Sequence, residues 1–559
     1  MSIELQVTGA PGCGKSSSLA GTYDTGGGSD LIGHNIRRAA EKYGPEKVIV
    51  SSFTRAAATV MVEKSGTDIP RNNIGTTHAL GYRLMDSRLP IAETKAGVTS
   101  WNEWCEQNKA AQYKLPPKER DETVDEPSWD RTMASDAEAL LAQMNLQRSL
   151  LVHRSLWPPP VQAFSDRWER WKEEAGYIDF TDMLEVPLRE GGPGPGRPKI
   201  IFDDEVQDNT PLMASLIRLW GSFADVLVLA GDADQVLYNW IGADPGVFLD
   251  HPVPPENRRT LPQSYRVPRA VHAHAEAYIR KVTRRADREY LPRDADGEVR
   301  FLGGGSWMEP GLVVRDAQRY LAGGKRVMFL ASCSYMLGPL LHELRARGIP
   351  YGNPYRRSRG DWNPLHPGRG VSSAQRLLDY LRWSPGAWGD DVRQWYGLEL
   401  KRWVGAMKVA GVVRKGMKER LDALADGREV GFDALAELLE DDAMNAALDG
   451  DMGFFAAHLL ADKAKAMAFP LAVARSPGGA QQLREEPQVI VGTVHSVKGG
   501  ESEVVYVFPD LSAAGAAEWR RTGEPRDAVR RLFFVAMTRS SESLIFVPPY
   551  RSYLAAEVR

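Results

Sequence analysis

The sequence predicts an α/β protein built on two parallel sheets, each accompanied by a long and mainly helical insertion. Short apolar runs alternate with segments of helical periodicity, as in Val48–Ser52 followed by Arg55–Met61, and this alternation is typical of parallel sheets. The apolar runs form two groups along the chain, and long stretches without strand patterns lie between them. At 559 residues the chain is long enough for several domains.

The first element is a strand, Ile3–Val7, and a glycine-rich loop follows it directly. A glycine-rich turn between a strand and the N-terminus of a helix aims backbone N–H groups at phosphate oxygens. We expect Lys15 to contact the β- and γ-phosphates of a nucleotide and Ser16 to offer its hydroxyl to Mg²⁺. The residues of this predicted phosphate site are Gly9, Ala10, Pro11, Gly12, Cys13, Gly14, Lys15, Ser16 and Ser17.

The next informative strand, Lys199–Phe202, runs into acidic residues. Ligands of parallel sheets gather at the carboxyl ends of the strands. We therefore expect Asp204 to bind Mg²⁺ and Glu205 to act as general base on an attacking water. The alternative interpretation is an acidic turn that caps the following helix. A further strand, Val226–Ala230, ends at Asp232 in the same manner.

The positions of the strands predict four parts. Later strands occur at Val327–Leu330, Gln488–Gly492, Val504–Val507 and Ser543–Val547, which indicates a second α/β core. The predicted parts are a first core at 1–86 and 175–255, a first helical insertion at 87–174, a second core at 256–356 and 484–559, and a second, mainly helical insertion at 357–483.

Composition excludes several classes of protein. A formal net charge of −3 excludes a globally basic protein, so nucleic-acid contacts must come from local features. No apolar run is long enough for a membrane span, and Glu4 and Gln6 interrupt any signal peptide, so we expect a cytoplasmic protein. The cysteines Cys13, Cys105 and Cys333 are too far apart in sequence for a disulfide framework or a Cys-rich zinc site.

Eight segments, taken in chain order after the phosphate loop, resemble the motifs of superfamily 1 DNA helicases of the UvrD/Rep/PcrA type. The resemblance covers both predicted cores and implies two RecA-like parallel-sheet P-loop domains with two mainly helical insertion subdomains. It also implies ATP hydrolysis at the interface of the two cores. The segments are Ser52–Ala58, Gly75–His78, Asp179–Leu184, Asp204–Asp208, Gly231–Trp240, Leu261–Arg266, Gly492–Glu501 and Arg530–Arg539.

The resemblance implies roles for residues around ATP. Gln235 would sense the γ-phosphate, and Arg266 and Arg539 would be arginine fingers contributed by the second core. Only eight residues precede Gly9, so the glutamine segment with which relatives read adenine is missing from this sequence, and nucleotide selectivity stays open. Tyr265 would stack on adenine, Glu501 would approach the ribose, and Gly499 belongs to the same nucleotide-binding set.

The resemblance further implies that single-stranded DNA binds along both cores. Bases would stack on aromatic side chains, although core packing is the alternative for each aromatic taken alone. Two basic clusters, within 280–288 and 356–359, would either hold phosphates or form a solvated face. The DNA-binding candidates are Phe53, Tyr238 and Trp240 for stacking, and Thr54, His78 and His495 for contacts with backbone or bases.

The sequence therefore predicts an ATP-dependent translocase on single-stranded DNA that unwinds duplex DNA, with 3′→5′ movement and with ATP and Mg²⁺ as cofactors. Its expected partners are single-stranded DNA and junctions of single-stranded with duplex DNA, with replication or repair proteins as further candidates and no membrane. One alternative is a DNA-stimulated translocase that remodels protein–DNA complexes with little unwinding. The other is a P-loop NTPase or kinase that does not act on nucleic acid.

Overall fold

The computed structural model describes residues 2–22, 34–85, 89–117, 135–251, 253–285, 288–357, 359–366, 370–383 and 394–559. The chain divides into two compact units. The first unit comprises Met1–Asp296 and Glu518–Thr538, and the second comprises Gly297–Ala517 and Arg539–Arg559. The chain thus leaves the first unit and later returns to it for one segment, which contains helix α22 (Glu524–Met537).

The first unit is built on a six-stranded parallel sheet with the strand order β3-β2-β4-β5-β1-β6. Strands β2, β4 and β5 are buried along their whole length. A parallel sheet is covered on both faces, which explains why these strands read as continuous apolar runs. The strands are β1 (Ile3–Gly9), β2 (Val48–Ser52), β3 (Ile74–Gly75), β4 (Ile200–Asp204), β5 (Val226–Gly231) and β6 (Arg258–Leu261).

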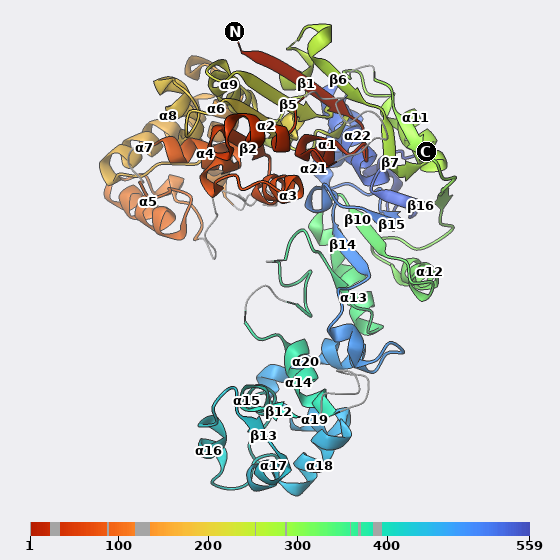
Figure 1. Cartoon of the computed structure of the whole chain (residues 1–559). Helices are drawn as coiled ribbons and strands as arrows, with labels where there is room; N and C mark the ends of the chain where they lie inside the picture. The colour runs from red at the N-terminus through yellow and green to blue at the C-terminus, as the bar shows by residue number, and fades with distance from the viewer. Residues whose placement is uncertain are drawn as a thin grey trace. The chain divides into compact units, whose positions relative to one another are not determined.

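Helices follow most of these strands and pack beside them (Figure 1). Threonines start three helices, because the Thr54, Thr76 and Thr210 side chains each accept a hydrogen bond from a backbone N–H of the first turn. The helices are α1 (Lys15–Ala20), α2 (Ile36–Tyr43), α3 (Arg55–Ser65), α4 (Thr77–Leu84), α8 (Asp182–Glu190), α9 (Pro211–Ser222), α10 (Gly246–Leu249) and α11 (Arg269–Ile279).

The first predicted insertion is helical where the structure describes it. Helices α5 (Lys95–Gln107), α6 (Asp136–Ser149) and α7 (Pro159–Ala175) surround an aromatic core. Its tryptophans Trp101 and Trp168 are fully buried, with ring centroids 5.0 Å apart. Residues 87–88 and 118–134 of the predicted insertion lie outside the described residues.

The second unit also contains a six-stranded parallel sheet, with the order β11-β14-β10-β15-β16-β9. The two α/β sheets confirm the predicted fold class. Helices α12 (Gly311–Ala322) and α13 (Gly338–Ala346) belong to this unit. The strands are β9 (Glu298–Phe301), β10 (Val327–Ala331), β11 (Tyr351–Gly352), β14 (Val489–Thr493), β15 (Ser502–Val507) and β16 (Ser540–Phe546).

The second predicted insertion is mainly helical in its described part, and its helices gather together in Figure 1. One short antiparallel pair, β12 (Trp395–Tyr396) with β13 (Glu429–Val430), interrupts the helices. Residues 358, 367–369 and 384–393 lie outside the described part of the chain. The helices are α14 (Ser373–Tyr380), α15 (Gly397–Val404), α16 (Lys418–Asp422), α17 (Phe432–Leu438), α18 (Asp441–Asp449), α19 (Met452–His458) and α20 (Ala461–Ala474).

The compact units group some segments differently from the predicted domains, whose boundaries stay predictions. The second core is predicted to start at residue 256, yet β6 pairs with β1 in the first sheet. Strands β7 (Gln263–Pro268) and β8 (Leu291–Arg293) and helices α11 and α22 also belong to the first unit. Within the described residues, no helix is both long enough and apolar enough to cross a lipid bilayer.

Candidate nucleotide and nucleic-acid site

The predicted site residues of the first unit lie at one edge of its sheet, where the carboxyl ends of the strands meet. Strand β1 leads into the phosphate loop, β4 into the acidic pair, and β5 into the segment with Gln235. Strand β5 lies between β4 and β1. Three motifs that are far apart in the sequence are therefore neighbours in the fold.

The phosphate loop has the backbone conformation that its glycines allow. Gly12 and Gly14 adopt φ angles of 76° and 72°, in the left-handed region that favours glycine. Helix α1 begins at Lys15, which places the N–H groups of its first turn at the loop. The Lys15 side chain is buried, and its ammonium donates a hydrogen bond to the Gly9 carbonyl at 2.7 Å. The Lys15 ammonium, which is predicted to contact phosphate, thus lies within the phosphate loop.

Strand β7 runs directly beside this loop. The Tyr265 N–H donates to the Gly12 carbonyl at 2.9 Å, and the Ser264 hydroxyl donates to the Pro11 carbonyl at the same distance. The Tyr265 ring is about half exposed, at 49%. Tyr265 and Arg266 thus lie next to the phosphate loop and belong to the first compact unit, while their roles at the nucleotide stay predictions.

Gly12→Ala is expected to weaken nucleotide binding about tenfold or more, which corresponds to about 1.4 kcal/mol. A Cβ at this position would lie 2.6 Å from Cβ of Arg266 and 2.8 Å from Oγ of Ser264, so β7 and the loop would have to separate. Titration with a fluorescent ATP analogue measures the affinity. Gly66→Ala is the matched control, because Gly66 also has a positive φ, of 67°, but has open space around it. Unchanged affinity in Gly12→Ala would contradict the close approach.

The acidic pair at the end of β4 fits a Mg²⁺ site. The Ser16 hydroxyl donates to Oδ2 of Asp204 at 3.1 Å, so the two predicted metal ligands adjoin, and hydroxyl and carboxylate oxygens are ligands that Mg²⁺ prefers. Burial, and to a smaller extent the charge of Glu205, raise the pKa of Asp204. Glu205 is half-buried with a φ of 61°, and its carboxylate accepts a hydrogen bond from Nε2 of Gln207 at 2.6 Å.

Two residues that the sequence argument left without a role connect β4 to β5. Oε1 of Gln207 accepts a hydrogen bond from the Asp232 N–H at 2.9 Å, and Oδ1 of Asp208 accepts one from the Leu237 N–H at 3.1 Å. Both connecting side chains are fully buried. Their signal was present in the sequence, since polar residues directly after a buried strand are strong candidates for holding the neighbouring loop. Gln235 is thereby held near the acidic pair.

The aromatic DNA-binding candidates of the first unit come together. The Phe53 and Tyr238 rings stack with centroids 4.3 Å apart and an interplanar angle of 26°, although they follow different strands. Tyr238 is buried, whereas Trp240 is 47% exposed, with its ring centroid 6.4 Å from that of Tyr238. Trp240 is therefore the best placed of the three to meet a base, and Tyr238 supports the cluster from within.

The polar DNA-binding candidates of the first unit lie at the starts of helices. Oγ1 of Thr54 accepts a hydrogen bond from the Ala57 N–H and so caps α3. His78 lies in the first turn of α4, and burial lowers its pKa to about 4. His78 is therefore neutral near pH 7 and offers a hydrogen bond rather than a positive charge.

The candidates of the second unit gather around the loop after β14. His495 is half-buried two residues beyond β14, Gly499 has a φ of 85°, and Glu501 is exposed. Arg539 is buried and its Nη1 donates to the Gly500 carbonyl at 3.3 Å. Arg539 thus adjoins Gly499 and Glu501, while its role as an arginine finger stays a prediction.

Two members of the basic cluster within 280–288 differ from both of its predicted interpretations, whereas Arg280 and Lys281 are exposed. The Arg285 and Arg288 side chains are only 17% and 3% exposed, and both form ion pairs with Asp234. Arg284 pairs with Asp244. The predictions of phosphate binding or of a solvated face are therefore wrong for Arg285 and Arg288, because buried carboxylates take their charge.

Helix α22 is fixed to this same segment by a buried acid that sequence reasoning missed. Asp527 is fully buried and accepts hydrogen bonds from the N–H and hydroxyl of Thr283. Arg531, also fully buried, donates to the Arg284 carbonyl at 2.9 Å. The only sequence signal was an acid one helical turn before the arginine pair Arg530–Arg531.

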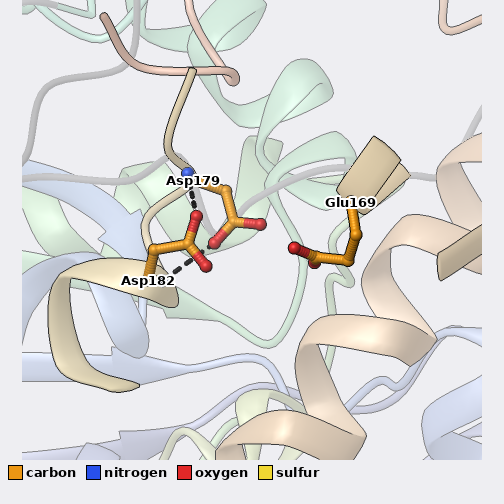
Figure 2. A group of neighbouring side chains, drawn as sticks. All are labelled: Glu169, Asp179 and Asp182. Carbon is orange, nitrogen blue, oxygen red and sulfur yellow. Dashed lines mark hydrogen bonds between the residues drawn. The ribbon is translucent and has the colours of Figure 1, made fainter. Parts of the chain in front are cut away.

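Figure 2 shows a group of three carboxylates, Glu169, Asp179 and Asp182, that lie close enough to suggest a metal site. Two cations already occupy the space between them. Arg148 reaches Asp179 at 2.8 Å, and Lys172 reaches Asp179 and Asp182 at 2.7 and 2.6 Å. We call these five residues the insertion network, since they join α6 and α7 to the start of α8. It explains the motif Asp179–Leu184 as a structural junction.

Comparison with known proteins agrees with this geometry. Residues 4–253 match the family model described as UvrD/REP helicase N-terminal domain. DNA helicase II of Escherichia coli is 24% identical over 46% of this chain and 37% of its own length. The putative ATP-dependent DNA helicase YjcD of Bacillus subtilis is 23% identical over 42% of this chain and 32% of its own length. The ATP-dependent DNA helicase Rep of Buchnera aphidicola is 24% identical, over 39% and 33%. The matched part thus spans about a third of the length of these relatives.

Proposed function

We propose, on the basis of its similarity to UvrD/Rep helicases, that this chain is an ATP-dependent translocase on single-stranded DNA that unwinds duplex DNA in the 3′→5′ direction. One observation carries the proposal. The phosphate loop, the Ser16–Asp204 pair and Gln235 meet at the carboxyl edge of one sheet, and the stacked Phe53–Tyr238 pair lies at the same edge. The proposed substrates are ATP and single-stranded DNA, including its junctions with duplex DNA.

The hydrolytic roles follow from the chemistry of the side chains. Lys15 would offset the negative charge of the β- and γ-phosphates, and Ser16 and Asp204 would hold Mg²⁺, which when bound would supply further positive charge at the phosphates. Glu205, the more exposed acid of the pair, accepts the proton of the attacking water. Gln235 contacts the γ-phosphate or the water through its amide. Arg266 beside Gly12 adds positive charge at the phosphates.

The proposed coupling of ATP hydrolysis to DNA movement rests on how few residues separate the γ-phosphate candidate from the base-stacking candidate. Gln235 and Tyr238 are only three residues apart on the loop after β5, and Asp208 fixes the Leu237 N–H between them. A change of the loop on γ-phosphate release would therefore reach the Phe53–Tyr238 stack directly. Base stacking contributes about 1–3 kcal/mol per base regardless of sequence, which suits a motor that moves along any strand.

The deciding experiment combines two assays on the purified chain. ATP hydrolysis is measured with and without single-stranded DNA, and unwinding is measured on duplexes with either a 3′ or a 5′ tail. We expect strong stimulation by DNA and unwinding of the 3′-tailed duplex. Stimulation without strand separation would indicate a translocase that remodels protein–DNA complexes. Hydrolysis that ignores DNA would overturn the proposal in favour of an NTPase of another kind.

Trp240→Ala is expected to raise the DNA concentration for half-maximal stimulation by roughly 5- to 100-fold, the equivalent of about 1–3 kcal/mol of stacking, while basal hydrolysis changes less than twofold (~0.4 kcal/mol). Hydrolysis is followed at increasing oligonucleotide concentrations. Phe223→Ala is the control, because Phe223 is a comparably exposed aromatic, at 53%, beyond the end of α9. Equal loss of basal and stimulated hydrolysis would assign Trp240 to packing.

A further inference from the structure

The Asp232 carboxylate is shared between Gln235 and an arginine that no motif contains. Oδ2 of Asp232 accepts a hydrogen bond from Nε2 of Gln235 at 2.7 Å. Nη2 of Arg288 lies 3.1 Å from Oδ1 and 3.2 Å from Oδ2 of the same carboxylate. The Asp234 N–H also donates to Oδ1, at 3.2 Å. Both oxygens of Asp232 are therefore held by defined donors.

This arrangement is buried, which makes its charge balance important. Asp232 is 1% exposed and the Arg288 side chain 3% exposed. A buried carboxylate without a counter-charge is costly, and removing one partner of a buried pair is strongly destabilising for the other. Arg288 thus supplies the buried counter-charge that faces the Asp232 carboxylate next to Gln235.

The bond to Asp232 fixes the orientation of the Gln235 amide. An amide nitrogen carries two N–H donors and its carbonyl oxygen is an acceptor. When one N–H is bound to Asp232, the plane of the amide is set, and the second N–H and the carbonyl point in defined directions. Sensing a γ-phosphate or orienting a water requires such preorganised directions.

We propose that Arg288 is a positioning residue for ATP hydrolysis, which acts through Asp232 to hold the amide of Gln235 in its working orientation. The inference rests on the proposed function and goes beyond it, because Arg288 would control the rate of hydrolysis without touching the nucleotide. It also gives a purpose to the contacts of α22. Asp527 and Arg531 fix residues 283–284, a few residues before Arg288, and so support the position of its guanidinium.

A neighbouring arginine provides the matched control. Arg285 belongs to the same segment, its side chain is 17% exposed, and it also forms ion pairs. Its guanidinium lies 2.8 Å from the Asp234 carboxylate and 3.2 Å from that of Glu276, and neither of these ion pairs involves Asp232. Arg285→Met therefore removes an equal charge and a similar volume while leaving the support of Gln235 in place.

The test compares Arg288→Met, Arg288→Lys, Arg285→Met, Gln235→Ala and the double variant Arg288→Met/Gln235→Ala in DNA-stimulated ATP hydrolysis. We expect Arg288→Met to lower kcat by ~10- to 100-fold, as misplacement of a catalytic group does, with KM for ATP changed less than about threefold. Arg288→Lys should recover part of kcat, since an ammonium can still pair with Asp232. Arg285→Met should keep kcat within about threefold of the wild type.

The double variant separates positioning from mere stability. If Arg288 acts through Gln235, the double variant should be no slower than Gln235→Ala alone. The inference would be overturned if the kcat losses of Arg288→Met and Gln235→Ala multiplied in the double variant. It would also be overturned if Arg285→Met lowered kcat as much as Arg288→Met does. Thermal unfolding of each variant shows whether it is folded. If Arg288→Met is not folded, the kcat of Arg288→Lys decides whether the inference holds. If Gln235→Ala leaves kcat unchanged, the proposed role of Gln235 itself fails, which is a different outcome from failure of Arg288.

Discussion

Lys15→Ala is expected to lower ATP hydrolysis by about 10²–10³-fold or more while leaving single-stranded DNA binding within about threefold of the wild type. The Lys15 ammonium is buried inside the phosphate loop and bonded to the Gly9 carbonyl, so its charge acts where phosphate charge would develop. The DNA-binding candidates follow other strands, namely β2, β3, β5 and β14. Release of inorganic phosphate measures hydrolysis, and fluorescence anisotropy of a labelled oligonucleotide measures binding.

Lys47→Ala is the control for this prediction. Lys47 is also a lysine of the first unit whose ammonium donates to a backbone carbonyl, that of Gly196, at 3.0 Å, but it lies before β2 and away from the loop. Its removal should leave both hydrolysis and binding unchanged. Normal turnover by Lys15→Ala would remove the loop from the mechanism. Parallel loss of hydrolysis and DNA binding would instead show that Lys15 supports the fold.

Asp179→Asn is expected to destabilise the first unit by about 3–5 kcal/mol, the usual effect of breaking a buried ion pair. Asp179 is fully buried and accepts from Arg148, Lys172 and the Trp168 indole N–H. These cations hold the pKa of Asp179 far below its usual range. Without its charge, two buried cations lose part of their compensation. Thermal unfolding measures the effect, and the midpoint should fall by roughly 10 °C.

Asp166→Asn on the same helix α7 provides the comparison. Asp166 pairs with Arg154, but their side chains are 64% and 46% exposed, and exposed ion pairs contribute at most about 1 kcal/mol. This variant should unfold at almost the wild-type temperature. If Asp179→Asn were equally harmless, the insertion network would not be the junction that joins α6 and α7 to α8.

The parts of the site that could be predicted are those whose signal is local. The phosphate loop is contiguous in the sequence, and its strand, glycines, Lys15 and Ser16 follow one another without interruption. The acids after β4 were placed correctly at a strand end because a buried parallel strand reads as an apolar run. The residue roles around ATP and DNA came from the resemblance, and those roles stay predictions.

The parts that could not be predicted depend on contacts between distant residues. Strand β6 has only one buried residue among four, so no apolar run predicted that it would pair with β1. Arg288 and Asp232 are both polar and lie far apart in the sequence, and nothing in either local pattern showed that they would be buried together. Asp527 was hidden for the same reason, because its partner Thr283 precedes it by 244 positions.

The return of the chain to the first unit has a consequence for its biosynthesis. Residues 1–296 include all strands of the first sheet but lack α22, which supplies buried Asp527 and Arg531. At about 5–20 residues per second, a ribosome needs roughly 10–50 s to make residues 297–538. During that interval Thr283 and Arg284 lack the hydrogen bonds that Asp527 and Arg531 of α22 provide. A chaperone would therefore be most useful to the nascent chain at this stage, before α22 is made.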